Sequence, residues 1–168
     1  MLFQTRRLYV RKLKPSDLPG FYDMQRNPNV MRYIKAPMTL VEAERELDRF
    51  IGYYRDASTF YRLWAIMRLA DTAFIGMCGV YRNQRAEYEV AYRLRERYWG
   101  QGFGSEIGAG LIDYLFASTQ LEVLTAYAHQ HNAGSIAILE RLMTFSGQVE
   151  SDSLEGHERK YTLERSRK

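Results

Sequence analysis

The chain is poor in cysteine and has no long apolar segment. Its 168 residues contain one cysteine, Cys78. This excludes an internal disulfide framework and a zinc site built from several cysteines, and it suits a reducing compartment. No window approaches the roughly 18 consecutive apolar residues of a membrane helix, and the N-terminus lacks the apolar core of a signal peptide. We therefore expect a cytoplasmic protein without a membrane partner.

An excess of one charge is also nearly absent. Lys and Arg number 24 against 20 Asp and Glu, which gives a net charge of +4. This excess favours acidic ligands such as phosphates without requiring nucleic acid. A nucleic-acid-binding module is therefore our last-ranked alternative, based on the 13 tyrosines and the basic end of the chain. The length predicts a single domain over residues 1–168.

Several familiar catalytic motifs are missing. The dinucleotide pattern Gly-x-Gly-x-x-Gly is not completed, because Ser105 and Ile107 occupy the positions where its last glycine would be needed. The phosphate-loop motif and the Gly-x-Ser-x-Gly elbow of hydrolases are absent as well. His129 and His131 give the only hint of a metal site. We interpret this pair as a loop end and expect no metal, because no third ligand can be named.

The pattern of apolar residues predicts strands and helices that alternate along the chain. Thr39 and Glu42 have the spacing of a capping box and begin the most regular predicted helix, over about 40–57. The other predicted helices cover about 103–118 and 132–142, and the predicted strands cover 6–13, 60–69, 73–82, 87–95 and 121–128, with a final hairpin over 146–164. This order predicts an α+β (mixed α/β) fold with a mixed sheet and helices on its faces.

The strand predicted over 87–95 carries carboxylates on one side. Strand side chains alternate between two faces. One face then holds Tyr88, Val90, Tyr92 and Leu94, and the other holds Glu87, Glu89, Ala91 and Arg93. Two carboxylates therefore point the same way.

A glycine cluster follows this strand and opens the next helix. It contains Gly100, Gly102 and Gly104. Glycine lets backbone approach a ligand closely, and the first amides of a helix are unpaired at the positive end of the helix dipole. The cluster therefore suits a phosphate or pyrophosphate. The alternative is a glycine-rich turn that only lets the helix pack against the strand.

Four motifs together resemble a known family. They are Thr5-Arg-Arg-Leu8, Asn27-Pro-Asn-Val-Met-Arg-Tyr-Ile34, Tyr98-Trp-Gly-Gln-Gly-Phe-Gly-Ser-Glu106 and Asn132-Ala-Gly-Ser135. In this order the chain resembles the GNAT superfamily of acyl-CoA-dependent N-acetyltransferases, and within it the RimJ/RimL branch that acetylates ribosomal-protein N-termini. The resemblance implies a mostly antiparallel sheet of about seven strands flanked by helices, with acetyl-CoA as co-substrate.

The resemblance also implies which residues hold acetyl-CoA. The pyrophosphate would lie on the loop formed by Gly100, Gln101, Gly102, Phe103, Gly104 and Ser105. The pantetheine arm would pair with the backbone of Arg93, Leu94 and Arg95, and Asn132 would flank it. Arg95 and Arg97 could add charge near the phosphates, although arginines at a strand end are more often solvated surface.

Acyl transfer to an amine requires the unprotonated amine, so a base is useful. By similarity to the family we assign Glu89 as the candidate general base and Glu87 as the second candidate. The alternative is an exposed carboxylate pair that balances Arg93 and Arg95 on a solvated face.

The family's proton donor for the leaving thiolate is missing. Many GNAT enzymes place a tyrosine on the last helix, where this chain has Leu139. Ser135 is the remaining hydroxyl of the motif, and we assign it as the candidate acid. A second departure is Thr144-Phe145, where the family commonly ends this helix with Gly-Phe.

The acceptor is the least defined partner. We expect residues 28–37 to line its site, with Arg32 and Tyr33 able to orient a peptide. The acceptor would be a protein N-terminus, by closest branch, or a small amine, aminoglycoside or polyamine. A non-catalytic acyl-CoA-binding module remains the alternative function, and a homodimer is compatible with the sequence.

Overall fold

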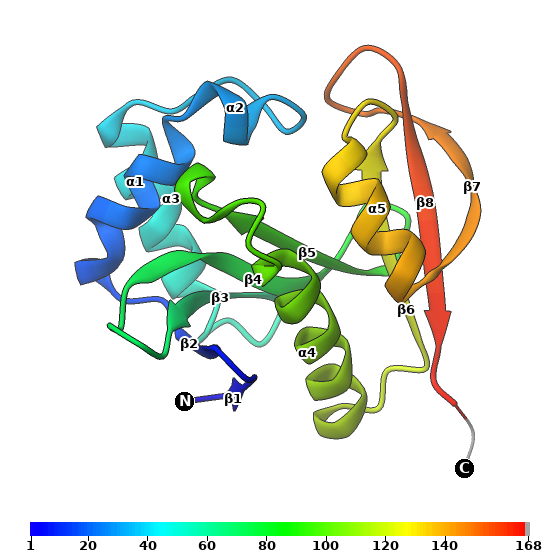
Figure 1. Cartoon of the computed structure of the whole chain (residues 1–168), viewed down its shortest axis with the longest axis horizontal. Helices are drawn as coiled ribbons and strands as arrows, with labels where there is room; N and C mark the ends of the chain where they lie inside the picture. The colour runs from blue at the N-terminus through cyan, green and yellow to red at the C-terminus, as the bar shows by residue number, and fades with distance from the viewer. Residues whose placement is uncertain (167–168) are drawn as a thin grey trace.

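An eight-stranded mixed sheet organises the chain in the computed structural model, which describes residues 1–166 (Figure 1). The strands lie side by side in the order β1-β2-β3-β4-β5-β6-β8-β7. Every neighbouring pair is antiparallel except β5 and β6, which are parallel. The predicted α+β fold is confirmed, with one strand more than expected.

The elements follow one another as the apolar pattern predicts. The strands are β1 (Phe3–Gln4), β2 (Leu8–Lys12), β3 (Tyr61–Arg68), β4 (Phe74–Arg82), β5 (Tyr88–Leu94), β6 (Val123–His129), β7 (Thr144–Glu150) and β8 (His157–Glu164). The α-helices are α1 (Leu18–Gln25), α2 (Pro28–Met31), α3 (Leu40–Gly52), α4 (Phe103–Ser118) and α5 (Ala133–Leu142), and the 3-10 turns are η1 (Pro15–Asp17) and η2 (Glu96–Tyr98). Within residues 1–166, no helix combines the length and apolar character that a membrane crossing requires.

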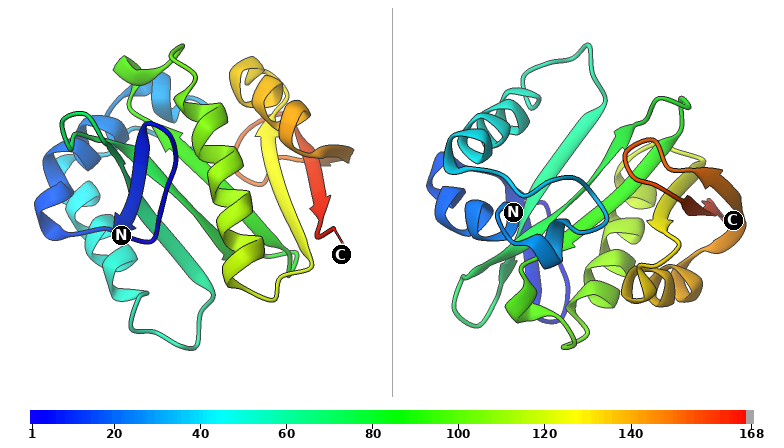
Figure 2. Two further views of the ribbon diagram at one scale, coloured as in Figure 1. Left: turned by 60° about the horizontal axis from the view of Figure 1, so that its bottom comes forward. Right: turned by 90° about the horizontal axis from the view of Figure 1, so that it is seen from above.

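Helices cover both faces of the sheet, as the two views in Figure 2 show. The alternation of side chains along β3 makes this arrangement necessary. Leu63, Ala65 and Met67 join the core beneath α1 and α3, whereas Trp64 and Ile66 join the core beneath α4. Because both faces of the strand are apolar, both must be covered to remove that surface from water.

An apolar stripe along α4 fixes this helix against the sheet. Phe103, Ile107, Leu111 and Leu115 are all buried, with at most 4% of each residue exposed. Burial of each such side chain contributes about 1.5–3 kcal/mol. This stripe therefore holds the N-terminal end of α4 beside the end of β5.

The sheet opens between β5 and β6. β5 pairs with β4 along its whole length, from Tyr88 to Leu94. Its pairing with β6 is limited to one register pair, Glu89 with Thr125. The two strands therefore diverge beyond this pair. In the described part of the chain, the C-terminal half of β5 has no strand partner on the side that faces β6.

The differences from prediction lie at the ends of elements and in short elements. α3 ends at Gly52 rather than near residue 57. β1 has two residues and α2 has four, too few for a period to appear in the sequence. The departure at Thr144-Phe145 begins β7.

The predicted capping box of α3 is present and gives a test of local stability. The Thr39 hydroxyl accepts a hydrogen bond from the Glu42 amide at 3.3 Å, and Glu42 accepts one from the Thr39 amide at 2.7 Å. We expect Thr39→Ala to lower the free energy of unfolding by about 1 kcal/mol, measured by urea denaturation. Thr39→Ser, which keeps the hydroxyl, is the control. An unchanged midpoint for Thr39→Ala would show that the box is not stabilising.

Candidate active site

The glycine cluster places an uncapped helix start at the end of β5. Gly100 and Gly102 have φ angles of +69° and +79°, a region that only glycine enters at little cost. Gly102 is the N-cap residue of α4, and within residues 1–166 no side chain caps this helix. The amides of residues 103–105 therefore remain available for an anion.

Packing alone does not explain the cluster. A Cβ on Gly104 would lie 2.8 Å from Ile138 of α5, so Gly104 does permit close helix packing. At Gly100, apart from its two chain neighbours, no heavy atom of the described residues lies within 4 Å of the Cβ position. The positive φ there serves the course of the loop, and the interpretation as a packing turn applies to Gly104 only.

The N-terminal segment is bonded to this loop through Glu106. One oxygen of Glu106 accepts hydrogen bonds from the Thr5 hydroxyl at 2.6 Å and the Arg7 amide at 2.7 Å. The other accepts one from Arg7 Nε at 2.7 Å. These bonds hold the pKa of Glu106 below its ordinary value although burial pushes the pKa up. Two motifs that are about 100 residues apart in the sequence thus form one unit.

Arg7 also touches the loop directly. Its Nη1 donates to the Gln101 carbonyl at 3.0 Å, and its guanidinium lies 4.3 Å from the centre of the Phe103 ring. Its Nη2 would be 3.4 Å from a Cβ at Gly102. Arg7 therefore supplies positive charge and mechanical support beside the free amides. Arg7 belongs to the motif Thr5-Arg-Arg-Leu8, but the sequence alone indicated no role for its side chain.

A cleft of about 700 Å³ extends from the loop along β5 to the start of α5. Most of the predicted cofactor residues line it together: Arg93, Leu94, Gly100, Gly102, Phe103, Gly104, Ser105 and Asn132. Gln101 and Arg95 are not among its lining residues. The Gln101 side chain bonds back to the Arg97 carbonyl at 2.9 Å, and the Arg95 side chain pairs with Asp23 of α1 at 2.8 Å. The charge of Arg95 is therefore directed toward α1 rather than the cleft.

A second cavity of about 290 Å³ adjoins this cleft. Six residues line both spaces: Tyr33, Ile34, Tyr92, Arg93, Asn132 and Ser135. Glu89 lines the second cavity, as does Glu158 of β8. The candidate base and the candidate acid are thus brought to the same region, where β5 and β6 separate.

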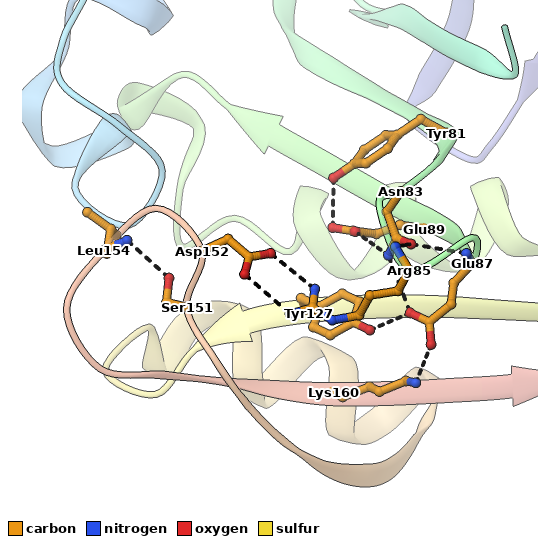
Figure 3. A network of polar contacts seen from close by, with 10 residues as sticks. All are labelled: Tyr81, Asn83, Arg85, Glu87, Glu89, Tyr127, Ser151, Asp152, Leu154 and Lys160. Carbon is orange, nitrogen blue, oxygen red and sulfur yellow. Dashed lines mark hydrogen bonds and ion pairs between the residues drawn. The ribbon is translucent and has the colours of Figure 1, made fainter.

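Glu89 is held by two neutral donors, as Figure 3 shows. The Tyr81 hydroxyl donates to one carboxylate oxygen at 2.7 Å and the Asn83 amide donates to the other at 3.1 Å. Burial raises the pKa of Glu89 above its ordinary value; these two bonds oppose the rise, and the charges of Glu158 and Glu87 add to it. A carboxylate with a raised pKa is a better proton acceptor.

Glu87 is in a different environment, although it lies on the same face. It forms an ion pair with Lys160 and accepts a hydrogen bond from Tyr127 (Figure 3). These bonds lower the pKa of Glu87 although burial opposes them. Neither carboxylate contacts Arg93 or Arg95 in the described residues, and both are partly buried. The alternative interpretation, an exposed pair that balances those arginines, is therefore wrong.

Two further residues of the second cavity had no signal in the sequence. Glu158 is partly buried, and burial together with the charge of Asp152 raises its pKa. Tyr81 of β4 lies directly across from Glu89 in the sheet register. Both residues lie outside the motifs, and only strand pairing brings them to the site.

The two histidines are not arranged as metal ligands. The buried ring of His129 stacks on Tyr33 with centroids 5.1 Å apart, and its Nε2 lies 3.1 Å from the Glu155 carbonyl. His131 is exposed. Among residues 1–166 no group of three metal-binding side chains occurs. Tyr33 thus reaches across from the segment after α2 to the end of β6.

The start of α5 places hydroxyl groups beside the cleft. Asn132 caps the helix, because its Oδ1 accepts a hydrogen bond from the Ser135 amide at 3.2 Å. Leu139 is buried. The hydroxyl of Tyr92 on β5 is buried and has no partner in the described residues. Burial raises the pKa of Tyr92 to about 12.

The helix start and the unpaired edge of β5 together define the class of protein. An anion site at one end of an unpaired strand suits a long carrier whose phosphates bind the helix and whose extended arm pairs with the strand. Coenzyme A thioesters have this form. A family model described as an acetyltransferase (GNAT) domain matches residues 7–143, and the chain belongs to this family.

Known proteins agree with this membership. The chain is 30% identical over 141 residues to the uncharacterized N-acetyltransferase p20 of Bacillus licheniformis, a match that covers 82% of this chain and 79% of p20. A GNAT acetyltransferase from Bacillus anthracis has the same fold, with a TM-score of 0.83, 17% identity and coverage of 96% of both chains. RimL, a ribosomal α-N-protein acetyltransferase in complex with coenzyme A, matches with a TM-score of 0.82, 14% identity and coverage of 97% of both chains. The chain is accordingly an N-acetyltransferase.

The contacts of Arg7 predict a specific defect in cofactor binding. We expect Arg7→Ala to raise the KM for acetyl-CoA about tenfold, since a hydrogen bond to a charged group contributes about 1.5–3 kcal/mol, while kcat changes little. Steady-state kinetics with varied acetyl-CoA measure both constants. Arg6→Ala is the matched control, because Arg6 is the exposed neighbour with the same charge. Equal KM values for the two variants would contradict the role of Arg7.

Proposed function

We propose that this enzyme transfers the acetyl group of acetyl-CoA to a primary amine, with Glu89 as the general base. The observation that carries the assignment is the position of Glu89. Its carboxylate has a raised pKa and lines a cavity that adjoins the cleft at the helix start. In that arrangement the amine can lie between the base and the thioester.

The cleft fits coenzyme A in both charge and shape. The free amides of residues 103–105 and the Arg7 guanidinium suit the pyrophosphate. The unpaired edge of β5 at residues 93–95 suits the amide groups of the pantetheine arm, which can pair with it as a short strand. The thioester then lies near Tyr92, Asn132 and Ser135.

The chemical step requires a neutral amine. A free α-amino group has a pKa of about 8 and a lysine side chain about 10.4, so both are largely protonated at neutral pH. Glu89 accepts the proton directly or through one water. The nitrogen lone pair forms the bond to the carbonyl carbon, the carbon–sulfur bond breaks, and its electron pair leaves on sulfur.

The leaving thiolate needs little assistance. A thiol has a pKa of about 8.5, so the coenzyme A thiolate can depart without a strong acid. Ser135 lines both spaces and is the candidate donor. The tyrosine that many relatives use is replaced here by Leu139, which cannot donate a proton.

Two acceptor classes fit the chemistry. The RimL relative acetylates a ribosomal protein at its α-amine, as its name states, and this supports a protein N-terminus. The small volume of the second cavity, about 290 Å³, favours a small amine.

Three further predictions from the sequence remain predictions. The chain is expected to form a single domain and to be located in the cytoplasm. The alternative function is a module that binds acetyl-CoA but releases no thiol from it with any amine.

The assignment of Glu89 predicts both a mutational and a pH effect. Glu89→Gln should lower kcat/KM by about 100-fold or more, the usual contribution of a general base. In the wild type kcat/KM should fall as the pH is lowered through the raised pKa of Glu89, because protonation removes the base. Release of the coenzyme A thiol across a pH series measures both effects.

Two controls separate catalysis from folding. Glu87→Gln alters the neighbouring carboxylate, which is paired with Lys160, and should change kcat/KM much less. The KM for acetyl-CoA should stay constant in Glu89→Gln. Full turnover by Glu89→Gln would remove the assignment.

A further inference from the structure

Arg93 of β5 is partly buried, and among residues 1–166 it has no directly bonded carboxylate. The side chain lies on the α1–α3 side of the sheet, where its Nη1 donates to the Gln25 side chain and lies 3.5 Å from the Met31 sulfur. Its Nε is buried and has no acceptor among residues 1–166. An arginine so placed normally has an anionic partner.

The surrounding charges leave a deficit of negative charge. Gln25 donates to Glu46 of α3 at 2.9 Å, so Glu46 reaches Arg93 only through Gln25. The other oxygen of Glu46 already accepts bonds from Lys35 at 2.9 Å and Arg49 at 2.8 Å. Glu46 is thus paired directly with two cations, and Arg93 is a third cation that reaches it only through Gln25. Burial lowers the pKa of Arg93 to about 10, and the charge of Glu46 only partly offsets the effect.

Arg93 also faces the acceptor region. It lines both the cofactor cleft and the second cavity, as do Tyr33 and Ile34. Glu89 lies on the same face of the same strand, four residues earlier, or about 13 Å along the backbone at 3.3 Å per residue. The long side chain of Arg93 can shorten this separation. The second cavity is therefore lined both by the carboxylate of Glu89, the candidate base, and by Arg93, a cation whose charge is only partly offset.

We propose that Arg93 forms a carboxylate-binding subsite in the acceptor cavity, and that the amine acetylated by this enzyme belongs to a small amino-carboxylate such as an amino acid. The inference rests on the proposed function and narrows its acceptor. A guanidinium binds a carboxylate through charge-assisted hydrogen bonds, and Nε of Arg93 has no acceptor of its own among residues 1–166. The backbone of Arg93 remains available to the pantetheine arm, since the side chain alone is engaged.

Paired acceptors test the subsite directly. Each of the 20 standard amino acids is compared with its own amide, which keeps the amine and the side chain but lacks the carboxylate. We expect kcat/KM to be at least tenfold higher for the acid of the preferred pair. The less basic amine of the amide biases the comparison against this result. Equal or better use of the amides, or preference for neutral peptide N-termini, would overturn the proposal.

Two variants with opposite expected effects separate binding from folding. Arg93→Met should abolish the preference for the acid: kcat/KM for the acid should fall at least tenfold, whereas kcat/KM for its amide, which lacks the carboxylate, should fall much less. Glu46→Gln removes the shared carboxylate and should lower the KM for the acid several-fold, because Arg93 then lacks compensation. Arg26→Met removes an exposed charge on the same side and is the control. If Arg93→Met does not fold, Arg93→Lys and Glu46→Gln give the same comparison.

A binding measurement distinguishes failure of this inference from failure of the proposed function. Protein saturated with coenzyme A is titrated calorimetrically with the amino acids and their amides, which requires no turnover. Acid-selective binding that Arg93→Met removes supports the subsite even if no thiol is released. Thiol release with simple amines but no acid selectivity overturns the subsite and leaves the acetyltransferase function intact. Loss of acetyl-CoA affinity in Arg93→Met would assign the arginine to the cofactor instead.

Discussion

The separation of β5 from β6 is the feature on which the site depends. Two parallel strands that pair at one position only, Glu89 with Thr125, must expose backbone groups beyond it. Unpaired backbone is costly when it is buried, so the gap is retained only where a ligand or solvent satisfies those groups. The gap makes room for an extended carrier, and it also brings the cavity around Glu89 next to the cleft. The proposed binding of acetyl-CoA and the proposed role of Glu89 therefore both depend on the separation of β5 from β6.

The helix start beside this gap is supported from a distant part of the chain. Glu106 accepts bonds from Thr5 and Arg7, while Arg7 reaches the Gln101 carbonyl and the Phe103 ring. A loop with two glycines at positive φ has high conformational entropy when it is unfolded. Contacts that fix it before the ligand arrives reduce the ordering needed on binding. The short N-terminal strand β1 and the turn after it thereby gain a role beyond completing the sheet.

Two carboxylates that point the same way, Glu89 of β5 and Glu87 just before this strand, have pKa shifts of opposite direction because their partners differ. Lys160 and Tyr127 stabilise the charged form of Glu87, whereas the donors to Glu89 among residues 1–166 are neutral and the charge of Glu158 raises its pKa further. The period of the strand predicted that both point the same way, but it could not predict these partners. Lys160 and Glu158 come from β8, more than sixty residues further along the chain. The same holds for Arg93, whose neighbours come from α1, α2 and α3.

The sequence by itself determined the order of the elements, the glycine-rich helix start and the family, because each of these depends on the spacing of residues that are close together in the sequence. The alternation in β5, the stripe on α4 and the caps at Thr39 and Asn132 all follow from contacts within a few residues. Only the tertiary structure decided which carboxylate has a raised pKa, that Arg95 turns toward Asp23, and that Arg93 has no directly bonded carboxylate among residues 1–166. The burial and charge environment of these side chains depend on residues that are far away in the sequence. A local sequence pattern does not predict which of these distant residues will be in contact.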